Sequence, residues 1–189
     1  MADFEFDTGV RWARFDPGRT LARRPDAELP FVKAVRAGPA LLLDTTVYID
    51  QLQGRLPDMA AGFIEVRQVN HSAVAIQELM HTVGRLDPVH SGTSEAIHQI
   101  GRLIKAMPAH RVFAADPDTL GRAALLSGIL CRLQGYAKDE KLRALMDSIL
   151  FLQARRLGFA VLTRNIRDYD YFLQLFPAAR ILLYRTEPA

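Results

Sequence analysis

The sequence predicts an α/β protein, a three-layer α/β/α structure with a central, mainly parallel sheet and an N-terminal extension. Two observations predict this class. Short apolar runs of the kind that form buried strands alternate with longer segments of helical periodicity. The chain also has 189 residues, of which 49% are hydrophobic and 24% charged, as in an ordinary globular domain. Helices between successive strands favour parallel pairing, with helices covering both faces of the sheet.

We expect three segments along the chain: an extension over 1–39, a domain over 40–184 and a tail over 185–189. The first 39 residues are rich in glycine, proline and alternating charges, and they show no sustained helical or strand periodicity. The extension should pack on the domain, or meet a partner, through its aromatic residues Phe4, Phe6, Trp12 and Phe15.

Five short segments have the apolar character of strands. The first is wholly apolar and stops at Asp44, which is typical of a strand buried on both faces. The others follow predicted helices and are closed by polar residues, glycine or a new helix. The predicted strands are 40–43, 69–72, 111–114, 159–163 and 181–184.

Seven segments have helical periodicity with start and stop signals. Ser91 or Thr93 can cap one helix, and Asp116 followed by Pro117 opens another. Gly158 closes the longest of the seven. The predicted helices are 46–54, 58–67, 73–84, 91–107, 116–133, 138–157 and 168–176.

Composition excludes several classes of protein. The single cysteine, Cys131, cannot form an internal disulfide, which argues against a disulfide-stapled scaffold. There is no apolar run of the roughly 20 residues that cross a bilayer, and the first residues are acidic where an export signal is basic. We therefore expect a cytoplasmic protein. A net charge of +3 is too small to name a partner.

Four carboxylates stand in or beside apolar surroundings, where an unpaired charge is costly: Asp44, Glu78, Asp147 and Asp168. Each has an ordinary explanation when taken alone. Asp44 and Asp168 could cap helices, and Glu78 could lie on a solvated helix face. Asp147 could pair with Arg143, one helical turn earlier.

Topology favours a joint explanation for these acids. Asp44 and Asp168 both follow predicted strands, and parallel strands end at the same edge of a sheet. The helices that carry Glu78 and Asp147 flank that sheet. Four acids that meet at one edge repel one another unless cations intervene, and ligation by oxygen alone selects Mg²⁺ or Mn²⁺. Acidic two-metal sites perform in-line phosphodiester chemistry.

Four motifs occur in order along residues 40–184, and they resemble those of the PIN-domain ribonucleases, whose bacterial members include the VapC toxins of type II toxin–antitoxin systems. The first is Leu-Leu-Asp-Thr-Thr-Val-Tyr-Ile at 42–49. The second ends in Gln-Glu-Leu at 77–79. The third opens with Asp-Ser-Ile-Leu at 147–150, and the fourth comprises Leu-Thr-Arg-Asn at 162–165 with Asp-Tyr at 168–169.

The resemblance implies a Mg²⁺- or Mn²⁺-dependent endoribonuclease that acts as a toxin on an RNA substrate. It makes Asp44, Glu78, Asp147 and Asp168 the catalytic and metal-binding acids, with Thr46 and Asn165 as accessory polar residues. A cognate antitoxin protein, with a segment that fills the acidic crevice, and a homodimer are also implied. This sequence departs from the family pattern at Tyr169, where phenylalanine is frequent.

Arg164 and Arg167 flank the fourth acid and are candidate contacts to the RNA backbone, although cations also favour helix ends without any ligand. Three other functions remain open. The same fold could serve as a non-catalytic module that binds RNA or protein, or as a DNA-directed nuclease. Two Glu-x-x-His pairs, Glu78 with His81 and Glu95 with His98, could instead belong to a di-iron helix bundle.

Overall fold

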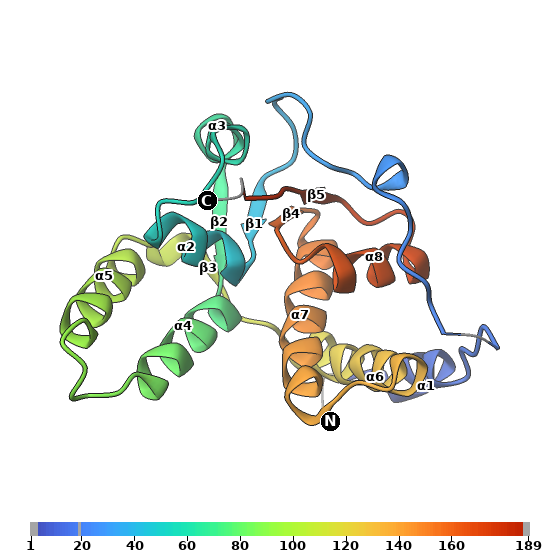
Figure 1. Ribbon diagram of the computed structural model, residues 1–189. Coiled ribbons are helices and arrows are strands. Elements are labelled where there is room, and N and C mark those ends of the chain that lie inside the picture. The colour runs from blue at the N-terminus through green and yellow to red at the C-terminus, as the bar shows by residue number, and fades with distance from the viewer. Residues whose placement is uncertain (1–3, 19, 187–189) are drawn as a thin grey trace.

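The computed structural model describes residues 4–18 and 20–186, and it contains a five-stranded parallel sheet (Figure 1). The strands lie in the order β3-β2-β1-β4-β5, and every pair of neighbours is parallel. They comprise β1 (Leu41–Leu43), β2 (Val69–Ser72), β3 (Val112–Phe113), β4 (Ala160–Thr163) and β5 (Ile181–Leu183). The predicted fold class is confirmed.

Helices cover both faces of the sheet (Figure 1). One layer comprises α2 (Thr45–Leu52), α3 (Asp58–Val66), α4 (Ala73–Arg85) and α5 (Thr93–Lys105). The other comprises α1 (Phe6–Ala13), α6 (Pro117–Gln134), α7 (Lys138–Leu157) and α8 (Ile166–Leu175). Two short 3₁₀ turns, η1 (Asp26–Glu28) and η2 (Ala109–Arg111), lie in the connections.

Two hydrophobic cores lie on opposite faces of the sheet. Alternation along β1 places Leu41 and Leu43 in the core beneath α2, α3, α4 and α5, while Leu42 lies in the core beneath α6, α7 and α8. Leu42 pairs with Val161 of β4, which is in the same core. The wholly apolar character of the strand therefore reflects burial on both faces.

The capping residues explain where several helices begin and end. Ser72 at the end of β2 accepts a hydrogen bond from the Val74 amide, so strand and helix meet without a loop. Asp116 caps α6, which has Pro117 in its first turn. Gly158 ends α7 in the left-handed region, with a φ of 73° that costs glycine little.

The extension contains a helix that its sequence did not predict. α1 is only eight residues long, so its periodicity is brief, and it is stabilised by packing against α6. Trp12 packs on Phe176 with 5.1 Å between the ring centroids, as the aromatic pattern predicts. Phe6 and Phe15 are 66% and 41% exposed, so they do not anchor the extension on the domain, and the alternative that they meet a partner stays a prediction.

Further along, the extension is fastened to α8 and to the edge of the sheet. Arg24 pairs with the fully buried Asp170, and Phe31 forms a β-bridge with Leu183 of β5. Residues 1–3 and 19 of the extension and 187–189 of the predicted tail lie outside the described residues. Among the described helices, none combines the length and the apolar character that crossing a bilayer requires.

Candidate functional site

The strand order reverses between β1 and β4, because β2 and β3 follow on one side of β1 and β5 follows on the other side of β4. In open parallel sheets, ligands bind outside the carboxyl ends of the strands at such a switch point. Asp44 directly follows β1, and Thr163 is the last residue of β4. The topology therefore selects the edge where these two residues meet.

Asp44 is held by three hydroxyl or amide donors. Its side chain caps α2 by accepting from the Thr45 amide at 2.8 Å. Thr46 Oγ1 donates to Asp44 Oδ2 at 2.6 Å, and Thr163 Oγ1 donates to the same oxygen at 2.5 Å. The residue is only 2% exposed. The capping role that Asp44 could have alone is real, but its second oxygen faces across to β4.

Glu78 reaches the same edge from α4. Thr45 Oγ1 donates to Glu78 Oε2, so the first turn of α2 contacts both Asp44 and Glu78. Glu78 is partly buried. The alternative in which it lies on a solvated helix face is therefore wrong.

Asp147 and Asp168 are joined by one amide. Asn165 caps α8, and its Nδ2 donates to Asp147 Oδ2 at 2.9 Å and to Asp168 Oδ2 at 3.0 Å. Tyr136, from the connection between α6 and α7, donates its hydroxyl to Asp168 Oδ1 at 2.6 Å. Both carboxylates are buried, at 6% and 3% exposure. Among the described side chains, no ion pair links Asp147 to Arg143, and the helix cap is Asn165, not Asp168.

The carboxylates share one electrostatic environment. Burial raises the pKa of Asp44 above its usual value. Burial, with the charge of Asp44, raises the pKa of Glu78 to about 7 against the hydrogen bond from Thr45. Burial and the charges of Asp44, Glu78 and Asp168 raise the pKa of Asp147 well above its usual value. The negative charges are therefore close enough to repel one another.

The donor set fits a hard divalent cation in its chemistry. It consists of carboxylate oxygens supported by hydroxyls and an amide, and a cation would relieve the cost of their ionisation. Within the described ranges, however, no three histidine, cysteine, aspartate or glutamate side chains converge in metal-ligand geometry. Each carboxylate is hydrogen-bonded to protein groups instead.

The two arginines beside the fourth acid are engaged in ion pairs. Arg164 Nε donates to the fully buried Asp50 at 2.7 Å, and its backbone amide donates to Thr46 Oγ1 at 3.2 Å. Arg167 pairs with Glu140 at 2.9 Å and with Asp168 at 3.3 Å, while 45% of its side chain is exposed. Both arginines therefore have structural partners.

Sequence analysis missed several supporting residues. Thr163 had a signal, because it ends a predicted strand at the same edge as Asp44. Tyr136 and Asp50 had none, since their partners Asp168 and Arg164 are 32 and 114 positions away in the chain. Long-range pairs of this kind depend on the tertiary fold.

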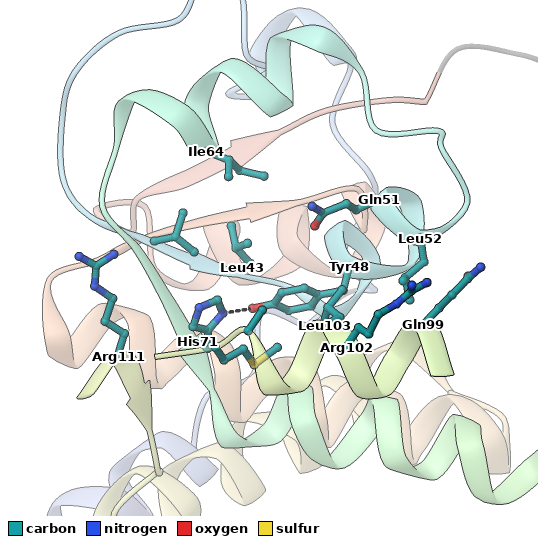
Figure 2. Close-up of a pocket in the computed structure, with 13 residues that line it drawn as sticks. Leu43, Tyr48, Gln51, Leu52, Ile64, His71, Gln99, Arg102, Leu103 and Arg111 are labelled. Carbon is teal, nitrogen blue, oxygen red and sulfur yellow. Dashed lines mark hydrogen bonds between the residues drawn. The ribbon is translucent and has the colours of Figure 1, made fainter. Parts of the chain in front are cut away.

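A separate groove of about 590 Å³ lies between α2, α3 and α5, and none of the four carboxylates lines it. Figure 2 shows Tyr48 and His71 joined across its floor, where the Tyr48 hydroxyl lies 2.7 Å from His71 Nδ1. Leu43, Ile64 and Leu103 give the groove apolar walls, as Figure 2 also shows.

The di-iron alternative is contradicted by the fold. A five-stranded sheet stands where this alternative requires a helix bundle. His81 and His98 are exposed, and Glu95 accepts a hydrogen bond from Gln99 on the surface of α5. The histidines of both Glu-x-x-His pairs therefore lie on helix surfaces, away from the edge that Glu78 reaches.

Comparison with known proteins shows which solved structures share this fold. No protein-family model and no curated protein matches the chain. Solved structures do match. A chain of the DNA-bound VapBC complex from Salmonella typhimurium is 16% identical with a TM-score of 0.54, and the match covers 76% of this chain and 97% of that one. A chain of VapBC2 from Rickettsia felis, bound to a promoter DNA fragment, is 11% identical with a TM-score of 0.53, with coverage of 77% and 99%.

A chain of FitAcB from Neisseria gonorrhoeae gives a similar result, with 17% identity, a TM-score of 0.52 and coverage of 76% and 96%. At these identities the likeness shows the fold. The protein has the three-layer PIN-like fold of the VapC toxins, as its four sequence motifs indicated.

Proposed function

We propose that the protein is a metal-dependent endoribonuclease and the toxin of a toxin–antitoxin pair. One observation carries the proposal. Hydrogen bonds from Thr45 link Asp44 with Glu78, and those from Asn165 link Asp147 with Asp168, beside the switch point of the sheet, where ligands bind in such folds. Buried carboxylates that repel one another persist when they serve a site.

The side chains of this chain have separable tasks in that function. The four carboxylates would hold a divalent ion, and the chemistry supplied by such an ion would be activation of water and stabilisation of the departing oxygen of a phosphodiester. Thr46 and Thr163 fix one oxygen of Asp44. Asn165 holds Asp147 and Asp168 at a set separation, and Tyr136 orients the second of these.

Contacts to the RNA backbone belong to the same proposal. Arg167 is the better placed of the two predicted arginines, because 45% of its side chain is exposed beside Asp168. Arg164 is 35% exposed and its Nε is engaged by Asp50, so its outer nitrogens would have to make the contact. Phosphate contacts of this kind position the substrate without selecting its sequence.

Partners and location complete the proposal. The similar structures are complexes of the VapBC and FitAB type, which supports a cognate antitoxin protein for this chain. We propose that a segment of the antitoxin fills the acidic crevice, that the toxin is a homodimer and that it works in the cytoplasm.

The direct test is cleavage of single-stranded RNA in the presence of Mn²⁺ by the wild type and by Asp44→Asn. We expect the variant to lose about a hundredfold or more in rate, because metal-ion catalysis contributes several kcal/mol. Asp118→Asn, which lies on α6 and pairs with Arg122, is the matched control and should retain its rate. Equal rates for the wild type and Asp44→Asn would overturn the proposal.

The substrate class is tested in the same assay. Single-stranded DNA of the same sequence should be cleaved far more slowly than RNA. Faster cleavage of DNA would make the protein a DNA-directed nuclease. If neither nucleic acid is cleaved and calorimetry shows no binding of Mn²⁺ at millimolar concentration, the protein is a non-catalytic member of the fold.

A further inference from the structure

The extension and the domain together form a pocket of about 370 Å³, and none of the four carboxylates lines it. α1 lies against α6 (Figure 1), and the pocket opens between these helices and the end of α8. Its volume is within the range of small-molecule sites in proteins, which are concave and mostly apolar. Its apolar lining consists of Trp12, Phe15, Leu126, Ile129, Leu175 and Phe176.

The apolar walls of this pocket are held in place by the core. The Trp12 ring lies 5.1 Å from the Phe176 ring, and Phe176 also packs on the ring of Phe151 at 5.8 Å. Leu126 and Ile129 are buried members of the same core. The pocket is therefore preformed, and a ligand does not have to order these side chains when it binds.

Two arginines of the extension stand at the pocket without a countercharge. Arg11 and Arg14 both line it, and both are exposed. Among the described side chains neither forms an ion pair, whereas Arg122 of α6 pairs with Asp118 at 2.8 Å. The dipole of α1 favours cations near its C-terminus even without a ligand. That preference does not explain why both arginines border an apolar pocket.

Two further arginines contact neutral groups of the same pocket. Arg132 donates to the backbone carbonyl of Phe15 at 2.5 Å, and the Arg155 guanidinium lies 4.6 Å from the centre of the Phe176 ring. Neither contact neutralises the charge of the arginine. An apolar pocket with a positively charged rim is complementary to a ligand that has an apolar body and an anionic end.

We propose that this pocket binds a small amphiphilic carboxylate. The aliphatic chain of the ligand lies against Ile129 and Leu175, and its carboxylate pairs with Arg11 and Arg14. Guanidinium groups bind carboxylates through charge-assisted hydrogen bonds, and burial of the aliphatic chain adds affinity. The inference depends neither on a metal ion nor on the proposed nuclease function.

Trp12 is the only tryptophan of the chain, so its fluorescence reports on this pocket. Sodium octanoate is titrated into the full-length protein in a buffer without divalent cations, and 1-octanol serves as the neutral ligand of equal chain length. We expect a saturable change in emission with octanoate. The dissociation constant should be about tenfold higher for octanol, because octanol lacks the charge that pairs with the arginines.

The double variant Arg11→Gln with Arg14→Gln removes both charges and keeps the apolar walls. It should bind octanoate about tenfold more weakly than the wild type does, and octanol equally well. Arg156→Gln is the matched control, since Arg156 does not line the pocket and pairs with Asp116 instead. This control should bind both ligands as the wild type does.

Three results would overturn the inference. The first is equal affinity of the wild type for octanoate and octanol, and the second is a preference for octanoate that survives in the double variant. The third is the absence of saturable octanoate binding at millimolar concentration, in both fluorescence and calorimetry. None of these results bears on RNA cleavage, so the proposed function is tested separately.

Discussion

Glu78 makes the metal-free protein sensitive to pH. Its pKa is raised from 4.5 to about 7 in the folded state, so the folded chain binds more protons than the unfolded chain between these values. The contribution of Glu78 to the free energy of unfolding should therefore be greatest below pH 4.5. That contribution should be lost as the pH rises toward 7. Urea unfolding at pH 5 and 7.5 measures the difference.

Glu78→Gln is the matching variant for that experiment. It should reduce the loss of stability across this range, while the raised pKa values of Asp44 and Asp147 leave part of the slope in place. A slope in Glu78→Gln equal to that of the wild type would show that Glu78 ionises normally in the folded protein.

Asp50 shows how a buried charge supports the site from a distance. It accepts hydrogen bonds from Arg164 at 2.7 Å and from the Tyr184 hydroxyl at 2.8 Å, and Arg164 in turn contacts Thr46. Arg164→Ala should lower the free energy of unfolding by about 2 kcal/mol, less than for a fully buried pair because Arg164 is 35% exposed.

The double variant Asp50→Asn with Arg164→Ala measures the interaction between these two side chains separately from the effect of each single substitution. Once the buried charge is removed, loss of the arginine should cost less than it does alone, and denaturant titration of all four proteins gives the coupling. Strictly additive effects would mean that Arg164 does not stabilise Asp50 and is free to serve the RNA.

At the scale of elements, the extension is attached to α8 close to the fourth acid. Arg24 contacts the fully buried Asp170 through its backbone amide at 2.7 Å and its Nε at 2.6 Å, two residues after Asp168. Arg24→Ala should destabilise the protein by about 2 kcal/mol, because a buried carboxylate loses its countercharge. Trypsin should then cleave the segment 20–36 faster.

Arg85→Ala, at the exposed end of α4, is the control for this variant. It should match the wild type in both unfolding and proteolysis. Cleavage of the Arg24→Ala variant at the wild-type rate would show that other contacts, such as the bridge between Phe31 and Leu183, fasten the extension without Arg24.

Most elements could be predicted because each contains its own signal. The strand at 69–72 and the helix at 138–157 agree with β2 and α7, where apolar pattern, cap and closing glycine coincide. α1 could not be predicted, because an eight-residue helix is stabilised by what it packs against. Local sequence patterns predict single helices and strands, but they do not predict contacts between residues that are far apart in the chain.

At the scale of the whole molecule, the sheet order brings the site together. Sequence patterning placed Asp44 and Asp168 after strands, but it did not say that β1 and β4 are neighbours, which is what sets Thr163 against Asp44. Thr46 and Asn165 contact acids of their own motifs, but the hydroxyls of Thr163 and Tyr136 reach Asp44 and Asp168 from distant parts of the chain. The resemblance named the four acids together with Thr46 and Asn165, whereas the contacts from Thr163 and Tyr136 depend on the tertiary fold.

Diffraction from crystals soaked in Mn²⁺ and measured at a wavelength where manganese scatters anomalously would locate the ion directly. An anomalous peak bounded by Asp44, Glu78, Asp147 and Asp168, at the carboxyl ends of β1 and β4, is the predicted result. Absence of a peak there at saturating Mn²⁺, with the carboxylates still hydrogen-bonded to Thr163 and Asn165, would contradict the account.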